Sequence, residues 1–290
     1  MKTPLGTLTE DRLTSLLANQ LRQPSSDTIG IGDDCALLSN GTLLKTDCIV
    51  EGQHYLPHTS PQLIGRKAVN RVLSDFAAMG GWPTHLLITI GLRQSSFLED
   101  VLELYKGMEE ALTPYGCTIV GGETVIVDTS DKEFISVSGT GQLNTSTPIL
   151  RSGAKVGDLI YVSGALGNSF HSEHHLTFTP RLMESLWLSK HVNVSAMMDL
   201  SDGIARDLPR LTTLSNVGYT LDLNNLPLRA GADTKAALEE GEDYELLFTL
   251  PSEESPNLRK APFPFYQIGS ITKNTPIPLS GGWDHLERTT

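Results

Sequence analysis

The chain has 290 residues, which is too many for one simple core and suits two domains. It carries 34 acidic and 22 basic side chains, so its net charge is −12. This charge argues against a nucleic-acid or anionic-membrane partner, because both require a basic surface. We expect domains at 1–145 and 146–290, joined through the polar stretch 144–157.

The three cysteines lie far apart and form no CxxC pair. A structural zinc site or a disulfide framework is therefore disfavoured, and a reducing cytoplasm is the expected compartment. The first twelve residues contain two acids and no long apolar run, which does not resemble a signal peptide. No stretch approaches the ~20 apolar residues that a membrane-spanning helix needs.

The first predicted elements bring carboxylates together. Leucines at helical spacing predict a helix over 8–20. Asn40-Gly41 between two apolar runs predicts a hairpin, which would bring Asp33 and Asp34 close to Asp47. Because neighbouring carboxylates repel, we expect a hard cation such as magnesium to neutralise them.

Ser60 as N-cap and Pro61 at the first helical position predict a helix that runs to about Met79. Its spacing places Asp75 on the apolar, inward face. An inward aspartate is either a buried carboxylate that caps nearby backbone or a ligand. The polar side of this helix is expected to carry Arg66, Lys67, Asn70 and Arg71.

Strands are predicted over 85–92, 117–120 and 134–143, with a helix over 96–113 that opens on a Ser96/Glu99 capping box. Gly121-Gly122 precede Glu123, and paired glycines allow a phosphate or another chain to approach the backbone. Strands and helices alternate without regular repetition, which favours an α+β fold.

A strand over 158–164 should begin the second half. The following 164–193 segment contains histidines at 171, 174 and 175. It has no cysteine and no clear helical register, so we expect an exposed loop and not a metal site. Ser201 is expected to cap a helix that Pro209 ends or kinks. Asp199 and Asp202 beside it either hold a metal-bound phosphate or interact with the helix dipole.

The last predicted elements are strands over 219–223, 245–250 and 265–271 and a helix over 233–239. Trp283 lies near the end of the chain, where a tryptophan by itself indicates packing more often than ligand binding.

The signatures of several enzyme classes are missing: P-loop, protein kinase, GxGxxG, GxSxG and HExxH. What remains is a set of acids in loops or on inward faces, which suits metal-assisted phosphoryl transfer without a protein nucleophile. These acids are Asp33, Asp34, Asp47, Asp75, Glu123, Asp199 and Asp202.

Together these motifs resemble the thiamine-monophosphate kinase family, within the PurM-like superfamily of aminoimidazole ribonucleotide synthetase. They occur in the family's order and span nearly the whole chain. The matching stretches are 30–38 (GIGDDCALL), 46–55 (TDCIVEGQHY), 65–83 (GRKAVNRVLSDFAAMGGWP), 121–124 (GGET), 151–163 (RSGAKVGDLIYVS), 198–208 (MDLSDGIARDL) and 241–249 (GEDYELLFT).

The resemblance implies phosphorylation of thiamine monophosphate to thiamine diphosphate by direct in-line transfer from ATP, the last step of thiamine diphosphate biosynthesis. It also implies a two-domain PurM-like fold, with a homodimer paired into a barrel through the N-terminal sheets and a sandwich-like C-terminal domain. The implied magnesium ligands are Asp33, Thr46, Asp47, Asp75, Glu123, Asp199 and Asp202; the ATP contacts are Tyr105, Gly122, Glu123, Arg151 and Ser201; the thiamine contacts are His54, Glu242 and Trp283.

The chain departs from the family pattern at several points. Glu123 stands where Asp is usual, Lys45 where Ser or Thr is usual, and Glu240 where Gly is usual, and the 167–197 segment is shorter. Two alternatives therefore stay open: a synthetase-type relative that activates an amide or formyl oxygen with ATP, and a non-catalytic nucleotide-binding homologue.

Overall fold

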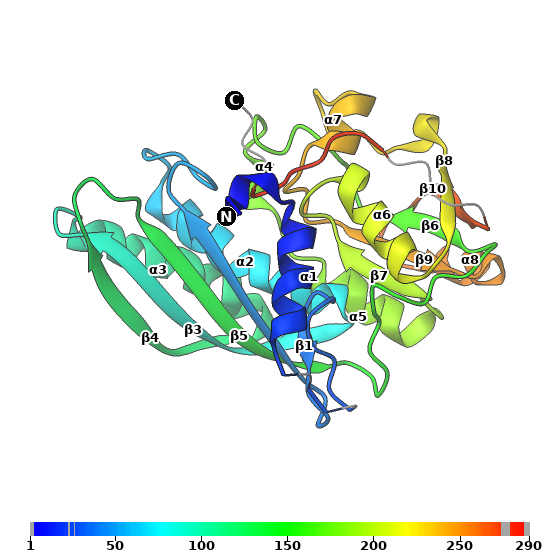
Figure 1. The fold of residues 1–290 in the computed structure, drawn as a ribbon, viewed down its shortest axis with the longest axis horizontal. Helices are drawn as coiled ribbons and strands as arrows, with labels where there is room; N and C mark the ends of the chain where they lie inside the picture. The colour runs from blue at the N-terminus through cyan, green and yellow to red at the C-terminus, as the bar shows by residue number, and fades with distance from the viewer. Residues whose placement is uncertain (1–2, 23, 26, 274–278, 287–290) are drawn as a thin grey trace.

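The computed structural model describes residues 3–22, 24–25, 27–273 and 279–286. Its strands form two separate five-stranded sheets (Figure 1). The first contains β1 (Ala36–Leu37), β2 (Thr42–Val50), β3 (Gly81–Arg93), β4 (Thr118–Val127) and β5 (Phe134–Leu143), in the order β1-β2-β5-β3-β4. The second contains β6 (Leu159–Val162), β7 (Ala196–Asp199), β8 (Gly218–Leu221), β9 (Leu246–Leu250) and β10 (Tyr266–Thr272), in the order β7-β9-β6-β10-β8.

The helices are α1 (Glu10–Gln20), α2 (Pro61–Ala78), α3 (Leu98–Leu112), α4 (His174–Thr177), α5 (Leu182–His191), α6 (Ile204–Leu214), α7 (Thr234–Glu239) and α8 (Ser255–Leu258). Together with the sheets they confirm the predicted α+β class. The first sheet is mixed, because β3 pairs with β4 in parallel and its other pairings are antiparallel. No helix in the described ranges is long and apolar enough to span a membrane.

The predicted joint at 144–157 contains no strand or helix and lies between the two sheets in the chain. One apolar cluster nevertheless includes residues from both halves, such as Val72 and Phe248. The domain boundary at 145 and the barrel formed with a second chain both stay predictions.

Helix α2 is the centre of the fold. It packs against α3, against β2, β3 and β5 of the first sheet, and against β7, α4 and α5 of the second half. Asp75 is on an inward face as predicted, but the expected polar outer side is wrong, since Lys67, Asn70 and Arg71 are also buried. A helix packed on two sides buries polar residues as well, and these need partners in the interior.

The hairpin of β1 and β2 is confirmed, with Ala36 opposite Leu44 and Gly41 at a φ of 82°. The predicted capping box is wrong: the Ser96 hydroxyl donates to Glu133, and Phe97 is the N-cap of α3. Ser201 is not a helix cap either. Helix α6 begins after Gly203 and continues through Pro209.

Regular secondary structure is present in the predicted 164–193 loop and at the paired glycines at 121 and 122. The 164–193 segment contains α4 and α5, in which Leu182 and Leu188 are fully buried, so the expected exposed loop is wrong. The paired glycines before Glu123 lie inside β4, where a Cβ on Gly122 would stand 1.8 Å from the carbonyl oxygen of Ile88. In this chain, therefore, Gly122 allows the neighbouring strand β3 to approach.

Candidate active site

A large open cleft of about 1480 Å³ lies where α1, β2, α2 and the loops of the second half meet. Most of the residues singled out from the sequence line it: Asp33, Thr46, Asp47, His54, Asp75, Arg151, Asp199, Ser201, Asp202, Glu242 and Trp283. Helix α1 forms one wall. It contacts the second half through Asp11, which pairs with Arg206 and Arg210.

Three buried carboxylates meet at one end of the cleft. Asp34, Asp75 and Asp199 each offer an oxygen within 4.8 Å of the other two. They come from the segment before β1, from α2 and from the end of β7, and we call them the carboxylate triad. Asp33, the neighbour implied as a ligand, instead accepts backbone N–H bonds from Asp34 at 3.0 Å and from Arg151 at 3.2 Å.

Crowding and burial disfavour ionisation at this end of the cleft. Burial, and then the charge of Asp34, raises the pKa of Asp199 to about 6. Burial and the same neighbouring charge raise the pKa of Asp33 to about 7. The pKa of Asp75 is well above its usual value, because burial and the charge of Asp199 outweigh the opposing effect of Lys45.

Fixed cations compensate the triad only in part. The Lys45 ammonium lies 2.6 Å from Asp75, and the Arg151 guanidinium lies 2.6 Å from Asp34. Asp199 accepts a hydrogen bond of 2.7 Å from the neutral Ser74 hydroxyl.

The donor set also fits a hard divalent ion. Asp34 Oδ2 is buried and has no hydrogen-bond partner among the described residues. Three convergent carboxylates, one with an unpartnered oxygen, are the oxygen ligands that magnesium takes in proteins. The reasoning from the residues already expected a cation to neutralise Asp34, whereas the ligand set implied by the family resemblance contains Asp33 and not Asp34.

The other predicted acids lie outside the triad. Asp47 pairs with Arg71 at 3.2 Å. Asp202 pairs with Arg210, which also contacts the fully buried Asp207. Burial, and then the charge of Asp202, raises the pKa of Asp207 to about 8, and the sequence reasoning did not single this residue out.

Four predicted positions are not brought to the triad. The Thr46 hydroxyl pairs with Ser138 at 2.9 Å, although Thr46 lines the cleft. Tyr105 on α3 and Gly122 and Glu123 on β4 are not among the described residues that line it. The contacts with metal or ATP expected of these four residues stay predictions.

In another part of the site, Glu242 is held by the fully buried Lys67, whose Nζ is 2.7 Å from Glu242 Oε1. The same ammonium donates to the backbone oxygen of His54 at 2.6 Å and contacts Nδ1 of His175 at 2.9 Å. Burial lowers the pKa of Lys67 to about 8. Although burial alone would raise the pKa of Glu242, Lys67 and Arg71 hold it below its usual value.

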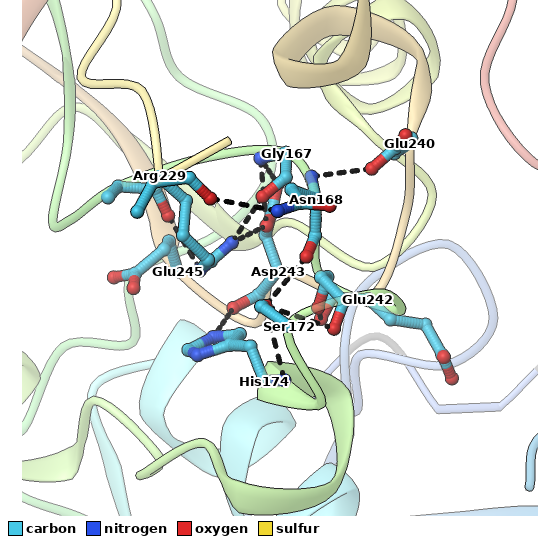
Figure 2. Close-up of polar contacts among 12 residues, drawn as sticks. Gly167, Asn168, Ser172, His174, Arg229, Glu240, Glu242, Asp243 and Glu245 are labelled. Atoms are coloured by element: carbon cyan, nitrogen blue, oxygen red, sulfur yellow. Dashed lines mark hydrogen bonds and ion pairs between the residues drawn. The ribbon is translucent and has the colours of Figure 1, made fainter. Parts of the chain in front are cut away.

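The backbone around Glu242 is held in an uncommon conformation. Glu242 and Tyr244 have φ values of 64° and 51°, a region that costs non-glycine residues about 1–3 kcal/mol each. Asp243 between them accepts from the Gly167 N–H and from Arg229 (Figure 2). This network fixes the position from which the Glu242 side chain enters the site.

Glu240, the departure from the family's glycine, belongs to the same network. Its carboxylate accepts a hydrogen bond of 2.5 Å from the Asn168 N–H (Figure 2). Its φ of −79° requires no glycine. Glu240 therefore anchors the 167–175 segment against the Glu242 loop.

Trp283 is exposed rather than packed in the core, with 38% of its surface accessible at the edge of the cleft. Its backbone N–H donates to the backbone carbonyl oxygen of Asp202 at 2.9 Å, and its ring meets that of His285 edge-on, with the centroids 6.2 Å apart. The core-packing expectation is wrong, and an aromatic face is available for a ring to stack on.

The first half of the chain, which contributes β1 to β5 and part of the cleft, is similar to the AIR synthase related class. A family model described as "AIR synthase related protein, N-terminal domain" matches residues 32–143. The chain belongs to the thiamine-monophosphate kinase family, because it is 33% identical to the thiamine-monophosphate kinase of Rhodopirellula baltica, over 92% of this chain and 90% of that protein. The enzyme of Haemophilus influenzae is 32% identical and covers 96% of this chain and 98% of its own length.

Solved structures agree with this family. AaThiL complexed with AMPPCP and TMP superposes with a TM-score of 0.86 at 30% identity, over 98% of this chain and 99% of that one. A HypE–HypF complex matches with a TM-score of 0.74 at 21% identity, over 94% of this chain and 97% of that one, which shows the shared fold alone.

Proposed function

We propose that this chain transfers the γ-phosphoryl group of ATP to thiamine monophosphate and releases ADP and thiamine diphosphate. The observation that carries the proposal is the buried triad of Asp34, Asp75 and Asp199. It lines the same cleft as Glu242 and Trp283. The likeness to a relative complexed with AMPPCP, an ATP analogue, and TMP supports it.

The triad is the proposed magnesium site, with Asp33, Asp47 and Asp202 nearby in the cleft. Magnesium held there would screen the phosphates from one another and stabilise the charge of the transition state. Arg151, which lines the cleft beside Asp34, is the proposed contact to the phosphate oxygens, and Ser201 is the proposed second contact to ATP.

No side chain needs to act as nucleophile or base in this reaction. The attacking group is a phosphate monoester whose second pKa is about 6, so its oxygens are already ionised at neutral pH. Catalysis then consists of positioning and charge stabilisation. Glu242, with its low pKa, is the proposed partner of the cationic thiamine ring system, Trp283 the proposed stacking surface and His54 a further contact.

A homodimer is the proposed assembly, in a cytoplasmic setting. Strand β4 is the edge of the first sheet and exposes Val120, Val125 and Ile126, and Leu87 of β3 is also exposed. A long apolar edge strand favours pairing with another chain. Gly122 and Glu123 on β4, and Tyr105, would then contact the nucleotide of the partner chain.

The test incubates the purified chain with ATP, magnesium and thiamine monophosphate and measures thiamine diphosphate after chromatographic separation. Product should form only with all three components, and EDTA should stop it. ADP formation only with precursors of aminoimidazole ribonucleotide would favour the synthetase alternative. ATP binding without turnover of any thiamine ester would favour a non-catalytic homologue.

A further inference from the structure

Lys45 places a positive charge beside the carboxylate triad. It lies on β2, where successive side chains alternate between the two faces, so Lys45 and Asp47 share one face of the strand and Thr46 lies on the other. Its Nζ is 2.6 Å from Asp75 Oδ1, and its side chain is 23% exposed and lines the cleft. The ammonium thus contacts Asp75 of the triad, and the Lys45 side chain also lines the open cleft.

The contact with Lys45 changes the charge balance of the triad. Three ionised carboxylates carry −3, and the paired Arg151 and Lys45 contribute +2. An oxygen of Asp75 that would otherwise be open to a second metal ion is already engaged by the ammonium. Asp34 Oδ2 still has no partner among the residues described.

An ammonium group can replace a metal ion in charge and in contact. It is a compact point charge with three donors, and one donor is directed at Asp75, which leaves two for phosphate oxygens. A lysine ammonium is charged at neutral pH, and here it lies 2.6 Å from the carboxylate of Asp75. Unlike magnesium, this charge cannot be removed by a chelator.

We propose that the Lys45 ammonium permanently occupies one cation position of the phosphate site, so that this chain binds one divalent ion fewer than its carboxylates would otherwise hold. This inference rests on the proposed function, because it assumes that the triad binds metal ions together with ATP. Asp34 and Asp199 remain for the divalent ions that are taken up from solution.

The test counts the Mn²⁺ ions bound per chain, by electron paramagnetic resonance or titration calorimetry, with and without AMPPCP. Lys45→Thr, which removes the charge and supplies an oxygen, should bind one more Mn²⁺ than the unmodified chain. Lys45→Arg, which keeps the charge, should bind the same number as the unmodified chain. Equal numbers in all three, with tighter binding in Lys45→Thr, would overturn the proposal, because Lys45 would then only compete with a metal that displaces it.

Stability separates this result from a folding defect. In EDTA, Lys45→Thr should melt several degrees below the unmodified chain, because Asp75 loses its partner, and Mn²⁺ should restore the difference. The double variant Lys45→Thr/Asp75→Asn should recover stability in EDTA without binding the additional ion. Failure of Mn²⁺ to restore Lys45→Thr would also overturn the proposal. A chain that binds AMPPCP and Mn²⁺ but phosphorylates no thiamine ester would refute the proposed function and leave the ion count intact.

Discussion

The cleft contains buried carboxylates at the triad and at Glu242, and their charges are balanced in opposite ways. At the triad, three acids share two fixed cations, and the pKa of Asp199 is raised to about 6. In the other part of the site, Glu242 alone faces Lys67 and Arg71, and its pKa is lowered. The triad therefore has room for more positive charge, whereas Glu242 has its charge paired without a metal ion.

Removing a carboxylate from the triad should have the largest effect. Asp75→Asn should lower kcat for thiamine diphosphate formation by about 10³-fold, because the loss of one preorganised electrostatic contact already costs about 10²–10³. The measurement is a steady-state assay together with Mn²⁺ binding. Asp158→Asn, at a buried carboxylate that accepts from the Lys155 N–H, is the matched control and should keep kcat. Full activity of Asp75→Asn would refute its role.

Breaking the Lys67–Glu242 pair should change substrate binding instead. Lys67→Met leaves Glu242 without its buried partner, and we expect a loss of about 3 kcal/mol in the free energy of unfolding. The KM for thiamine monophosphate should rise about 10–100-fold while the KM for ATP stays unchanged, since only the Glu242 end is disturbed.

A double variant controls for that loss of stability. Lys67→Met/Glu242→Gln removes both charges and should regain most of the stability but not the affinity for thiamine monophosphate. Parallel increases in both KM values would show that Lys67 supports the whole fold rather than this end of the site.

The comparison also predicts a pH dependence. The folded-state pKa of Asp199 is raised from 3.8 to about 6, so its protonated form is favoured in the folded chain. The stabilisation is fully present below about pH 4 and is lost as the pH rises through about 6, on the order of 2–3 kcal/mol. In EDTA, the melting temperature of the unmodified chain should therefore fall relative to Asp199→Asn over this range. A difference that is constant with pH would contradict the raised pKa.

The smallest effect is expected at the exposed edge of the substrate end. Trp283→Ala should raise the KM for thiamine monophosphate about 2–10-fold, because an aromatic contact contributes about 0.5–1.5 kcal/mol. The melting temperature should not change, because the side chain is partly exposed. Trp283→Phe keeps a stacking surface and should restore most of the affinity. An unchanged KM in Trp283→Ala would remove this residue from the site.

Local signals were sufficient where one element decides the outcome. The Asn40-Gly41 turn predicted the β1–β2 hairpin, and helical spacing placed Asp75 on the inward face of α2. The same spacing misplaced Lys67 and Arg71, because periodicity identifies one apolar stripe and α2 is packed on two sides. The sequence could not choose between Asp33 and Asp34 for the triad, because the tertiary structure directs the Asp33 carboxylate at the backbone N–H groups of Asp34 and Arg151.

The sequence alone predicted the chemical class. Acids in loops or on inward faces and the missing nucleophile motifs indicated metal-assisted phosphoryl transfer, and the family resemblance indicated the same reaction. The tertiary structure decided which cation meets which acid. Lys67 and Glu242 are 175 positions apart, and Lys45 and Asp75 come from a strand and a helix. Such pairs form only when packing brings the elements together and removes water from between them. The resulting burial decides whether a carboxylate of the cleft is paired with a cation or left open to a metal ion.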